Sequence, residues 1–310
     1  MAAMVHPDSW FIVVNPVSGG GRARRHVPGL RAALDRRRLP HECVATAAAG
    51  DARGLVAKAL ADGYRRLLAL GGDGSFHELV NGLVAQAEVP PAQCLVAVAA
   101  LGTGNDWARI MEVPDDPEQL AACMARGRGR RVDLGMAEDT HGQRLAFHNV
   151  AGAGLDAEVL RRLPRGGPRI LAYLAGLART IPRFRAPEFE LVIDGRKESG
   201  RFLLVLAANG PRCGGGMRLA DDAALDDGWL DLVTVAPVSV PRAMAALPKL
   251  FDGRLAGHPA LRVVRCRSAT IDARPRCGVE LDGQLAGETP VKLSLLPAAL
   301  QALDCRGSAE

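Results

Sequence analysis

The sequence predicts an α/β fold in its first half and a mainly antiparallel β fold in its second half. Three observations carry this prediction. Up to about residue 131, uninterrupted apolar runs alternate with helical stretches, which is typical of a parallel sheet covered on both faces. Beyond that point, short strand-like runs follow one another through turns such as Asp194-Gly195 and Asp282-Gly283. The chain has 310 residues, which is enough for two domains of ordinary size.

The first half is a regular succession of strands and helices. We expect strands where apolar residues run without interruption, at residues 10–14, 43–46, 67–70 and 95–100. We expect helices at residues 22–38, 51–60 and 75–84, and Asp51 is placed to cap the second of them.

The second half contains more strands than helices. We expect strands at residues 132–136, 145–150, 188–193, 201–208, 230–235, 261–266, 269–272 and 291–295. Two helices are expected, at residues 170–180 and 240–250, and the last apolar stretch, residues 298–303, is also expected to be helical. The sequence shows no internal repeat and no long linker.

The charge balance is basic and rests on arginine. The chain has 39 Lys and Arg against 34 Asp and Glu, a net charge of +5. Lysine contributes only Lys58, Lys197, Lys249 and Lys292. A GC-rich genome accounts for much of this excess, and binding to anions is the alternative, because arginine pairs with phosphate through two hydrogen bonds. Aromatic residues make up only 4% and no basic stripe is interleaved with them, so we expect no nucleic-acid partner.

The cysteines and the N-terminus indicate a cytoplasmic protein. Seven scattered cysteines form no CxxC pair and no Cys/His spacing suited to zinc, so reduced and mostly buried thiols are expected. The first ten residues lack the basic start and apolar core of a signal peptide. The longest apolar runs are too short to cross a bilayer, so a membrane would be met only at its surface.

Three glycine-rich turns follow predicted strands in the first half. They read NPVSGGG at residues 15–21, GGDGS at residues 71–75 and GTGND at residues 102–106. Because ligands bind at the carboxyl ends of parallel strands, we expect all three turns at one rim of the sheet. Glycine lets the backbone approach a phosphate closely, and helix N-termini supply free N–H groups. The chain has neither a GxxxxGK[ST] loop nor a GxGxxG after its first strand.

Asp73 stands between glycines at the end of a predicted strand. A carboxylate beside bound phosphates is repelled unless a cation intervenes, so Asp73 is a candidate to hold Mg²⁺, directly or through water. The alternative is that Asp73 forms the turn or caps a helix. Glu78, near the start of the same helix, either orients the loop or is solvated.

Taken together, the motifs resemble the diacylglycerol kinase catalytic domain family, which includes bacterial lipid kinases and sphingosine kinases. GGDG alone also suits the related NAD kinases, whereas its combination with GTGND and the long glycine-rich stretch near residue 209 is specific to the lipid kinases. The resemblance extends over nearly the whole chain. It rests on NPVSGGG, LGGDGSFHELVNGL at Leu70, LGTGNDWAR at Leu101, VDLG at Val132, FHNVAGAGLDAEV at Phe147, NGPRCGGGMRLADDAALDDGWLDLV at Asn209 and LDGQLAGETPV at Leu281.

The resemblance implies a two-domain fold. The first domain, residues 1–131, would be a three-layer α/β domain that binds ATP, as in NAD kinases and diacylglycerol kinases. The second, residues 132–296, would be a mainly antiparallel β domain that carries the lipid site. Residues 297–310 would form a C-terminal helix or tail that returns to the first domain.

The resemblance also implies site residues. ATP contacts would come from Asn15, Thr46, Gly71, Gly72, Asp73, Gly74, Ser75, Glu78, Gly102, Thr103 and Asn105. A structural Mg²⁺ would bind Asp227 and backbone oxygens of Ala224 and Trp229. Asp106 would belong to the catalytic polar network.

Two positions depart from the family pattern. Ser75 replaces a threonine and keeps the hydroxyl. The family motif DGE, whose glutamate is thought to take the proton of the lipid hydroxyl, reads Asp282-Gly283-Gln284 here. An amide can position a hydroxyl but cannot act as its general base. Asp282 and Asp106 are then the first alternative bases, ahead of Glu280 and Glu288.

The resemblance therefore predicts an ATP- and Mg²⁺-dependent kinase that phosphorylates a lipid hydroxyl at a membrane surface. The acceptor is diacylglycerol, another glycerolipid or a sphingoid base. The alternative is a nucleotide- or lipid-binding relative with weakened turnover, favoured by Gln284 alone. Arginines between residues 161 and 185 could dock the protein on the anionic inner membrane face or form a solvated basic surface. A homodimer through sheet edges is left open.

Overall fold

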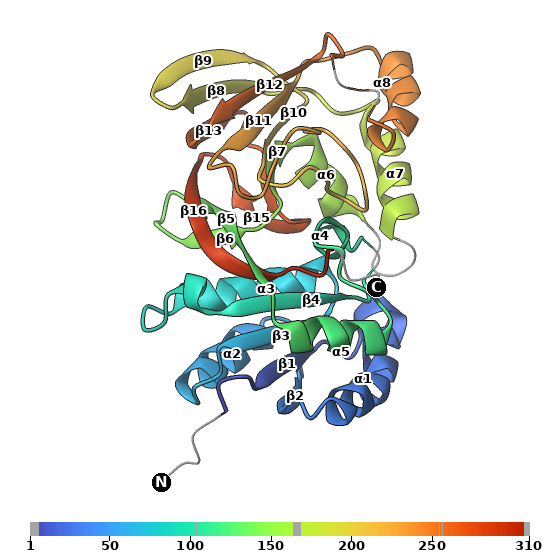
Figure 1. The fold of residues 1–310 in the computed structure, drawn as a ribbon. Coiled ribbons are helices and arrows are strands. Elements are labelled where there is room, and N and C mark those ends of the chain that lie inside the picture. Colours follow the sequence, from blue (N-terminus) through green and yellow to red (C-terminus); the bar gives the residue numbers. More distant parts are fainter. Residues whose placement is uncertain (1–5, 103, 164–168, 254, 256, 307–310) are drawn as a thin grey trace. The chain divides into compact units, whose positions relative to one another are not determined.

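The chain folds into two compact units in the computed structural model (Figure 1), which describes residues 6–102, 104–163, 169–253, 255 and 257–306. The first unit comprises Met1–Val132 with Ala298–Glu310, and the second comprises Asp133–Pro297. Both divisions fall one residue beyond the expected boundaries at residues 131 and 296. As predicted, the first unit is α/β and the second is built on antiparallel sheets.

A parallel sheet forms the centre of the first unit. It is ordered β2-β1-β3-β4, and all neighbours in this series are parallel. All five residues of β1 are buried, which explains why the strand reads as an unbroken apolar run. The strands are β1 (Trp10–Val14), β2 (His41–Ala45), β3 (Arg66–Gly71) and β4 (Leu95–Ala100).

Helices cover the two faces of this sheet. Right-handed crossovers place α1 on one face and α2 and α3 on the other. In agreement, α2 packs against α3, while α1 packs against α5, a helix that is not among those predicted from the sequence. The helices are α1 (Ser18–Arg36), α2 (Asp51–Ala61), α3 (Asp73–Ala85), α4 (Asp106–Ile110) and α5 (Pro117–Arg126), with a 3₁₀ turn at Pro91–Gln93.

The end of the chain is a strand, so the expectation of a helix at residues 298–303 is wrong. Strand β16 (Val291–Leu303) continues through this stretch, and Gln301 and Ala302 pair in parallel with Leu95 and Val96 of β4. The short apolar run is compatible with the residue spacing of a helix or of a strand, and the edge of β4 that is available for pairing favours the strand. A strand there satisfies backbone groups that a helix would leave exposed.

A disulfide ties this strand to α5. Cys123 of α5 is bonded to Cys305, so the expectation of reduced thiols is wrong for this pair. The cysteines that form no disulfide within the described part of the chain are Cys43, Cys94, Cys213, Cys266 and Cys277. The two bonded cysteines are 182 residues apart, and no local spacing could have indicated the bond.

Two antiparallel sheets form the second unit. One contains the first part of β16 with β13 (Ser268–Arg274), β8 (Glu188–Ile193) and β9 (Arg196–Arg201), together with the hairpin of β5 (Gly129–Glu138) and β6 (Arg144–Phe147). The other is ordered β12 (Leu261–Cys266), β11 (Leu230–Val235), β10 (Leu204–Ala208), β7 (Val150–Gly154), β14 (Gly278–Leu281) and β15 (Gln284–Glu288).

The core of the second unit comes from residues at alternate positions along these strands. Phe189, Leu191 and Ile193 of β8 pack in one cluster with Val205 and Ala207 of β10. Both predicted Asp-Gly turns are confirmed: the two residues of each turn have positive φ, and they join β8 to β9 and β14 to β15.

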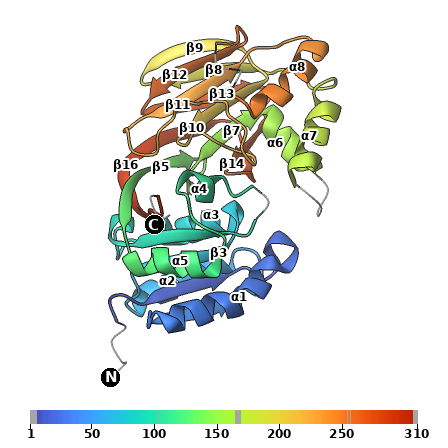
Figure 2. The same cartoon turned by 45° about the vertical axis from the view of Figure 1, so that its right-hand side comes forward.

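Three helices gather at one side of the second unit (Figure 2). Their shared apolar cluster comprises Leu155, Val159, Leu177, Ile181 and Ala243. The helices are α6 (Leu155–Arg162), α7 (Arg169–Thr180) and α8 (Val240–Ala246), followed by a 3₁₀ turn at Pro248–Leu250. Among the described residues, none of the helices has both the length and the apolar character needed to span a bilayer.

We predict that the disulfide stabilises the first unit. Reduction should lower the thermal midpoint, because a native disulfide typically contributes about 2–4 kcal/mol. Calorimetry with and without reductant measures the effect. The double variant Cys123→Ser/Cys305→Ser is the control and should not respond to reductant. An equal response of the native protein and this variant would contradict the prediction.

Candidate active site

Two of the glycine-rich loops meet at the carboxyl ends of β3 and β4. The backbones of Gly72 and Gly102 lie so close that a Cβ on Gly72 would come within 2.7 Å of the Gly102 Cα. The third loop, after β1, reaches the same place, because a Cβ on Gly19 would overlap the Leu101 carbonyl oxygen. The expectation that the three loops share one rim is confirmed, and they form a cradle that excludes side chains.

The loop after β1 carries three successive left-handed residues. Gly19, Gly20 and Gly21 have φ values of 58°, 67° and 84°, so the regular right-handed part of α1 begins only after Gly21. Glycine adopts these angles without steric cost. The backbone of this loop is therefore accessible to an anion at a point where any other residue would be strained.

Polar side chains hold the loops together. Asn15 Nδ2 donates to Ser75 Oγ at 3.1 Å, and Asn15 Oδ1 accepts the Val17 N–H at 3.3 Å. Asn105, itself at a positive φ of 55°, donates from Nδ2 to the carbonyl oxygens of Ala100 and Gly102, each at 3.0 Å. Its Oδ1 is buried and has no hydrogen-bond partner among the described residues. The two Nδ2 contacts fix the conformation of the loop that follows β4.

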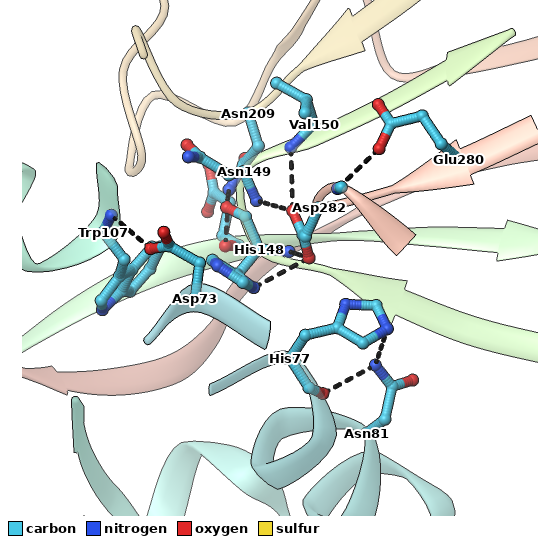
Figure 3. A network of polar contacts seen from close by, with 12 residues as sticks. Asp73, His77, Asn81, Trp107, His148, Asn149, Val150, Asn209, Glu280 and Asp282 are labelled. Carbon is cyan, nitrogen blue, oxygen red and sulfur yellow. Dashed lines mark hydrogen bonds and ion pairs between the residues drawn. The ribbon is translucent and has the colours of Figure 1, made fainter. Parts of the chain in front are cut away.

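Asp73 begins α3 and turns toward α4. Its Oδ1 accepts the Trp107 N–H at 3.2 Å, so the carboxylate caps the neighbouring helix rather than its own (Figure 3). The positive end of the α4 dipole favours this negative charge. Asp106 is buried at the start of α4, 3.8 Å from the Arg109 guanidinium. A half-buried carboxylate beside a phosphate cradle is suitable chemistry for Mg²⁺.

The remaining residues predicted to contact ATP are spread more widely. Thr46, after β2, donates from Oγ1 to the Val14 carbonyl oxygen at 3.3 Å. Glu78 accepts the Gly50 N–H at 3.2 Å and so orients the loop before α2. Gly71 adjoins the Ser75 side chain. Gly74 lies in the first turn of α3, and Thr103 lies outside the described residues.

In the second unit, Asp282 organises the connection between β6 and β7. Its Oδ1 accepts the N–H groups of Asn149 and Val150 at 2.9 and 3.1 Å, and its Oδ2 accepts the N–H of His148 at 3.0 Å (Figure 3). His148 Nδ1 lies 2.8 Å from the same Oδ2, and both side chains are buried. Because three backbone N–H groups already donate to its carboxylate, Asp282 is better suited to position this loop than to accept a proton. Gln284, two residues further on, begins β15 and is half-buried.

Among the residues expected to hold a structural Mg²⁺, Asp227 already contacts a cation. Asp227 Oδ2 lies 3.2 Å from Arg265 Nη2, and Asp227 Oδ1 accepts the Trp229 N–H at 3.1 Å. Arg265 also reaches Asp231, its cross-strand neighbour, with Nε 3.6 Å from Oδ1. The set around Asp227, Ala224 and Trp229 therefore stays a prediction for Mg²⁺, and an ion there would have to compete with this guanidinium for Asp227.

Asp133 and Asp231 are two further buried carboxylates that the sequence alone does not single out. Asp133 fixes the loop before β11, because its Oδ2 accepts the Gly228 N–H at 2.8 Å and its own N–H donates to the Leu225 carbonyl oxygen at 2.6 Å. Burial raises the pKa of Asp231, Arg265 lowers it, and the charges of Asp227 and Asp222 raise it further. The VDLG motif was the available signal for Asp133, whereas Asp231 is revealed only by the strand register.

Comparisons with known proteins agree with this architecture. Residues 9–137 match the family described as the diacylglycerol kinase catalytic domain. Residues 149–304 match the YegS C-terminal NAD kinase beta sandwich-like domain. An α/β unit with a glycine cradle and a β-sandwich unit thus define a chain of the NAD kinase and lipid kinase type.

Curated relatives narrow this class. A diacylglycerol kinase of Mycobacterium tuberculosis (strain CDC 1551 / Oshkosh) is 30% identical over 298 residues, covering 94% of this chain and 93% of the relative. A diacylglycerol kinase of Bacillus subtilis (strain 168) is 26% identical, with 90% of each chain covered. The chain belongs to the diacylglycerol kinase family.

Solved structures share the fold. A crystal structure of a diacylglycerol kinase from Bacillus anthracis str. Sterne has a TM-score of 0.71 at 22% identity, covering 97% of this chain and 98% of that one. Another structure from the same organism has a TM-score of 0.77 at 24% identity, covering 96% and 97%.

We predict that the glycine contact is essential for nucleotide binding. In Gly102→Ala, the new methyl group would lie 2.7 Å from the Gly72 Cα and 2.9 Å from Asn105 Oδ1. Affinity for an ATP analogue should fall by about tenfold or more, equivalent to about 1.4 kcal/mol. Gly54→Ala on α2 is the control, because nothing lies within 4 Å of the added methyl group. Equal affinities of both variants, measured by calorimetry, would contradict the role of the cradle.

We also predict that Arg265 makes the second unit less dependent on Mg²⁺. In Arg265→Ala, Asp227 and Asp231 lose their shared cation, and millimolar Mg²⁺ should then raise the thermal midpoint. The native protein should show a smaller response. Arg262→Ala is the matched control on the same strand, because Arg262 pairs instead with Glu198. A native protein that gains as much from Mg²⁺ as Arg265→Ala would show that the ion binds despite the guanidinium.

Proposed function

We propose that this protein is an ATP-dependent lipid kinase that phosphorylates the hydroxyl of diacylglycerol or a related lipid. The observation that carries the proposal is the contact between the Gly72 and Gly102 backbones, with Asp73 at its side. Family membership supports the reaction class.

The first unit supplies the groups that a nucleotide requires. Backbone N–H groups of the three glycine-rich loops would hold the phosphates, and Asn105 would fix the conformation of the loop after β4 through its two Nδ2 hydrogen bonds. Asp73 would hold Mg²⁺, which when bound supplies positive charge to offset the phosphate oxygens. The oxygen of the lipid hydroxyl bonds to the γ-phosphorus, the bond to ADP breaks, and the hydroxyl proton is released.

Gln284 determines how efficient this reaction can be. Its amide can align the lipid hydroxyl but cannot take the proton. Phosphoryl transfer has a largely dissociative transition state, so positioning and charge neutralisation contribute more than a base does. We therefore propose an active kinase. The second candidate function, a nucleotide- or lipid-binding protein with weakened turnover, is favoured specifically by Gln284.

The acceptor lipid would be met at the cytoplasmic membrane surface, where ATP is available. Basic residues of the second unit would assist, but they do not contribute equally. Arg161 pairs with Glu288 and Glu158, and Arg162 also pairs with Glu158. These two arginines are neutralised locally, so Arg179, Arg183 and Arg185 are the better candidates to contact anionic lipid headgroups.

We predict that labelled phosphate passes from ATP to a lipid. Asp73→Asn should lower the rate by about a hundredfold or more, because it removes the carboxylate charge that would hold Mg²⁺. Gln284→Glu should raise turnover by about tenfold or more by restoring a base. The assay uses purified protein, Mg²⁺ and mixed vesicles containing diacylglycerol, a monoacylglycerol or a sphingoid base. Asp62→Asn, at an exposed position after α2, is the control.

The outcomes separate the two candidate functions. Transfer by the native protein that Asp73→Asn abolishes supports the kinase. Absence of transfer from the native protein, with transfer by Gln284→Glu, would overturn the active kinase in favour of the binding protein.

A further inference from the structure

Two buried carboxyl groups meet in the second unit. Asp156 is the second residue of α6 and Glu280 is the third residue of β14, with exposed fractions of only 6% and 4%. Glu280 lies opposite Gly152 of β7 in the strand register. A Cβ on Gly152 would overlap Asp156 Oδ2 and would come within 3.0 Å of Glu280 Oε1. Both oxygens therefore occupy the space that a side chain at position 152 would fill.

One proton completes the hydrogen bonding of this pair. Asp156 Oδ1 accepts the Ala157 N–H at 2.7 Å, while Asp156 Oδ2 has no donor among the described residues. Glu280 Oε2 accepts the Gly283 N–H at 2.6 Å, which leaves Oε1 as the atom beside Asp156. A proton on Glu280 Oε1 gives the side-chain hydrogen bond between the two groups, whereas two ionised carboxylates there would repel each other.

The surroundings favour the protonated form. Burial raises the pKa of Asp156 to about 7, and burial followed by the Asp156 charge raises the pKa of Glu280 well above its ordinary value. Among the described residues, the ionisable groups around the pair are mainly acidic or neutral: Tyr173 from α7, Cys213, Cys277 and Asp282. Arg161 approaches this region near Cys277 and Gly278 but pairs with Glu288.

The pair is coupled to the turn that carries Gln284. Glu280 holds Gly283, the middle residue of residues 282–284, and Asp282 holds the β6–β7 connection through its three amide contacts (Figure 3). A movement of Glu280 would therefore displace both the turn and the loop bound to it.

We propose that Asp156 and Glu280 share one proton, and that this buried acid pair positions the turn at residues 282–284 for catalysis. Both are positioning residues. Their effect on phosphoryl transfer rests on the proposed function, whereas the shared proton itself does not. When the proton is lost, two like charges face each other with no cation from the described segments paired to either, and the turn is expected to shift.

The shared proton gives stability a definite pH dependence. The folded protein binds protons at this pair more tightly than the unfolded chain does, so the free energy of unfolding falls as pH rises above about 4 and continues to fall beyond about 7, because the pKa of Glu280 is raised as well. Glu280→Gln and Asp156→Asn replace the shared proton by an amide N–H. Both variants should lose less stability over this range than the native protein.

Chemical denaturation from about pH 5 to about pH 8 tests the pair without any need for activity. The native midpoint should fall, and that of Glu280→Gln and Asp156→Asn should fall less. Glu288→Gln is the matched control, because Glu288 is an exposed acid on the same hairpin and should behave as the native protein does. Identical pH profiles for Glu280→Gln and the native protein would overturn the proposal.

If the variants do not fold, infrared spectroscopy tests the shared proton in the native protein itself. Infrared spectra of the native protein near neutral pH should show the C=O stretch of a protonated carboxylic acid, which disappears at high pH. A fully ionised spectrum near neutral pH would overturn the proposal.

Activity measurements then test the coupling to the turn. The native rate should fall above neutral pH through kcat, while Glu280→Gln should keep its rate to higher pH. If no variant transfers phosphate but the midpoints and infrared band behave as expected, the proposed function fails and the acid pair stands. If transfer occurs with the same pH profile in the native protein and Glu280→Gln, the positioning role is refuted.

Discussion

The nucleotide side of this protein depends on one steric constraint, the backbone contact between Gly72 and Gly102. Two loops from neighbouring parallel strands can approach this closely only if neither residue has a Cβ. The contact brings Asp73 beside the first turn of α4 and places Asn105 so that its amide spans both ends of its own loop. A phosphate site built in this way uses backbone dipoles and needs no basic side chain. The arginine excess of the chain is therefore unnecessary for ATP binding.

The second unit is organised on a different principle, the burial of carboxylates that bind backbone N–H groups. Asp282 holds the β6–β7 connection, and Asp133 holds the loop before β11. Each replaces the solvation lost on burial by short amide contacts, so each strongly specifies its loop conformation. Asp156 and Glu280 follow the same principle only in part, because one oxygen of Asp156 has no amide donor. A carboxyl pair of this kind destabilises the fold at high pH. Groups with strongly shifted pKa values are common at functional sites.

Much of this arrangement could be predicted from the sequence because the signals are local. Apolar runs located β1, β4, β8 and β11, and glycines at strand ends located the loops that meet at Gly72 and Gly102. The failures involve partners distant in sequence. Pairing with the edge of β4 determines the last strand, and that strand in turn brings Cys305 to Cys123. The composition of residues 298–303 could therefore indicate neither the strand nor the disulfide. Asp231 and Arg265 are neighbours only through register, as are Glu280 and Gly152.

The same register bears on why an amide stands at position 284. The segment from Glu280 to Gln284 already carries two acids with buried side chains, Glu280 and Asp282, and Asp156 lies against Glu280. The Asp282 charge already raises the pKa of Glu280. A glutamate at position 284 would bring a further negative charge to the turn, and like charges in a region of low dielectric constant interact strongly. Such a glutamate would hold its proton more firmly, which favours general-base action near neutral pH but makes the buried pair harder to ionise. The turn already has acidic groups in Asp282 and the Asp156–Glu280 pair, and the neutral side chain of Gln284 adds no further negative charge. Compared with glutamate, glutamine at position 284 therefore gives up the general base but keeps the negative charge of the turn lower.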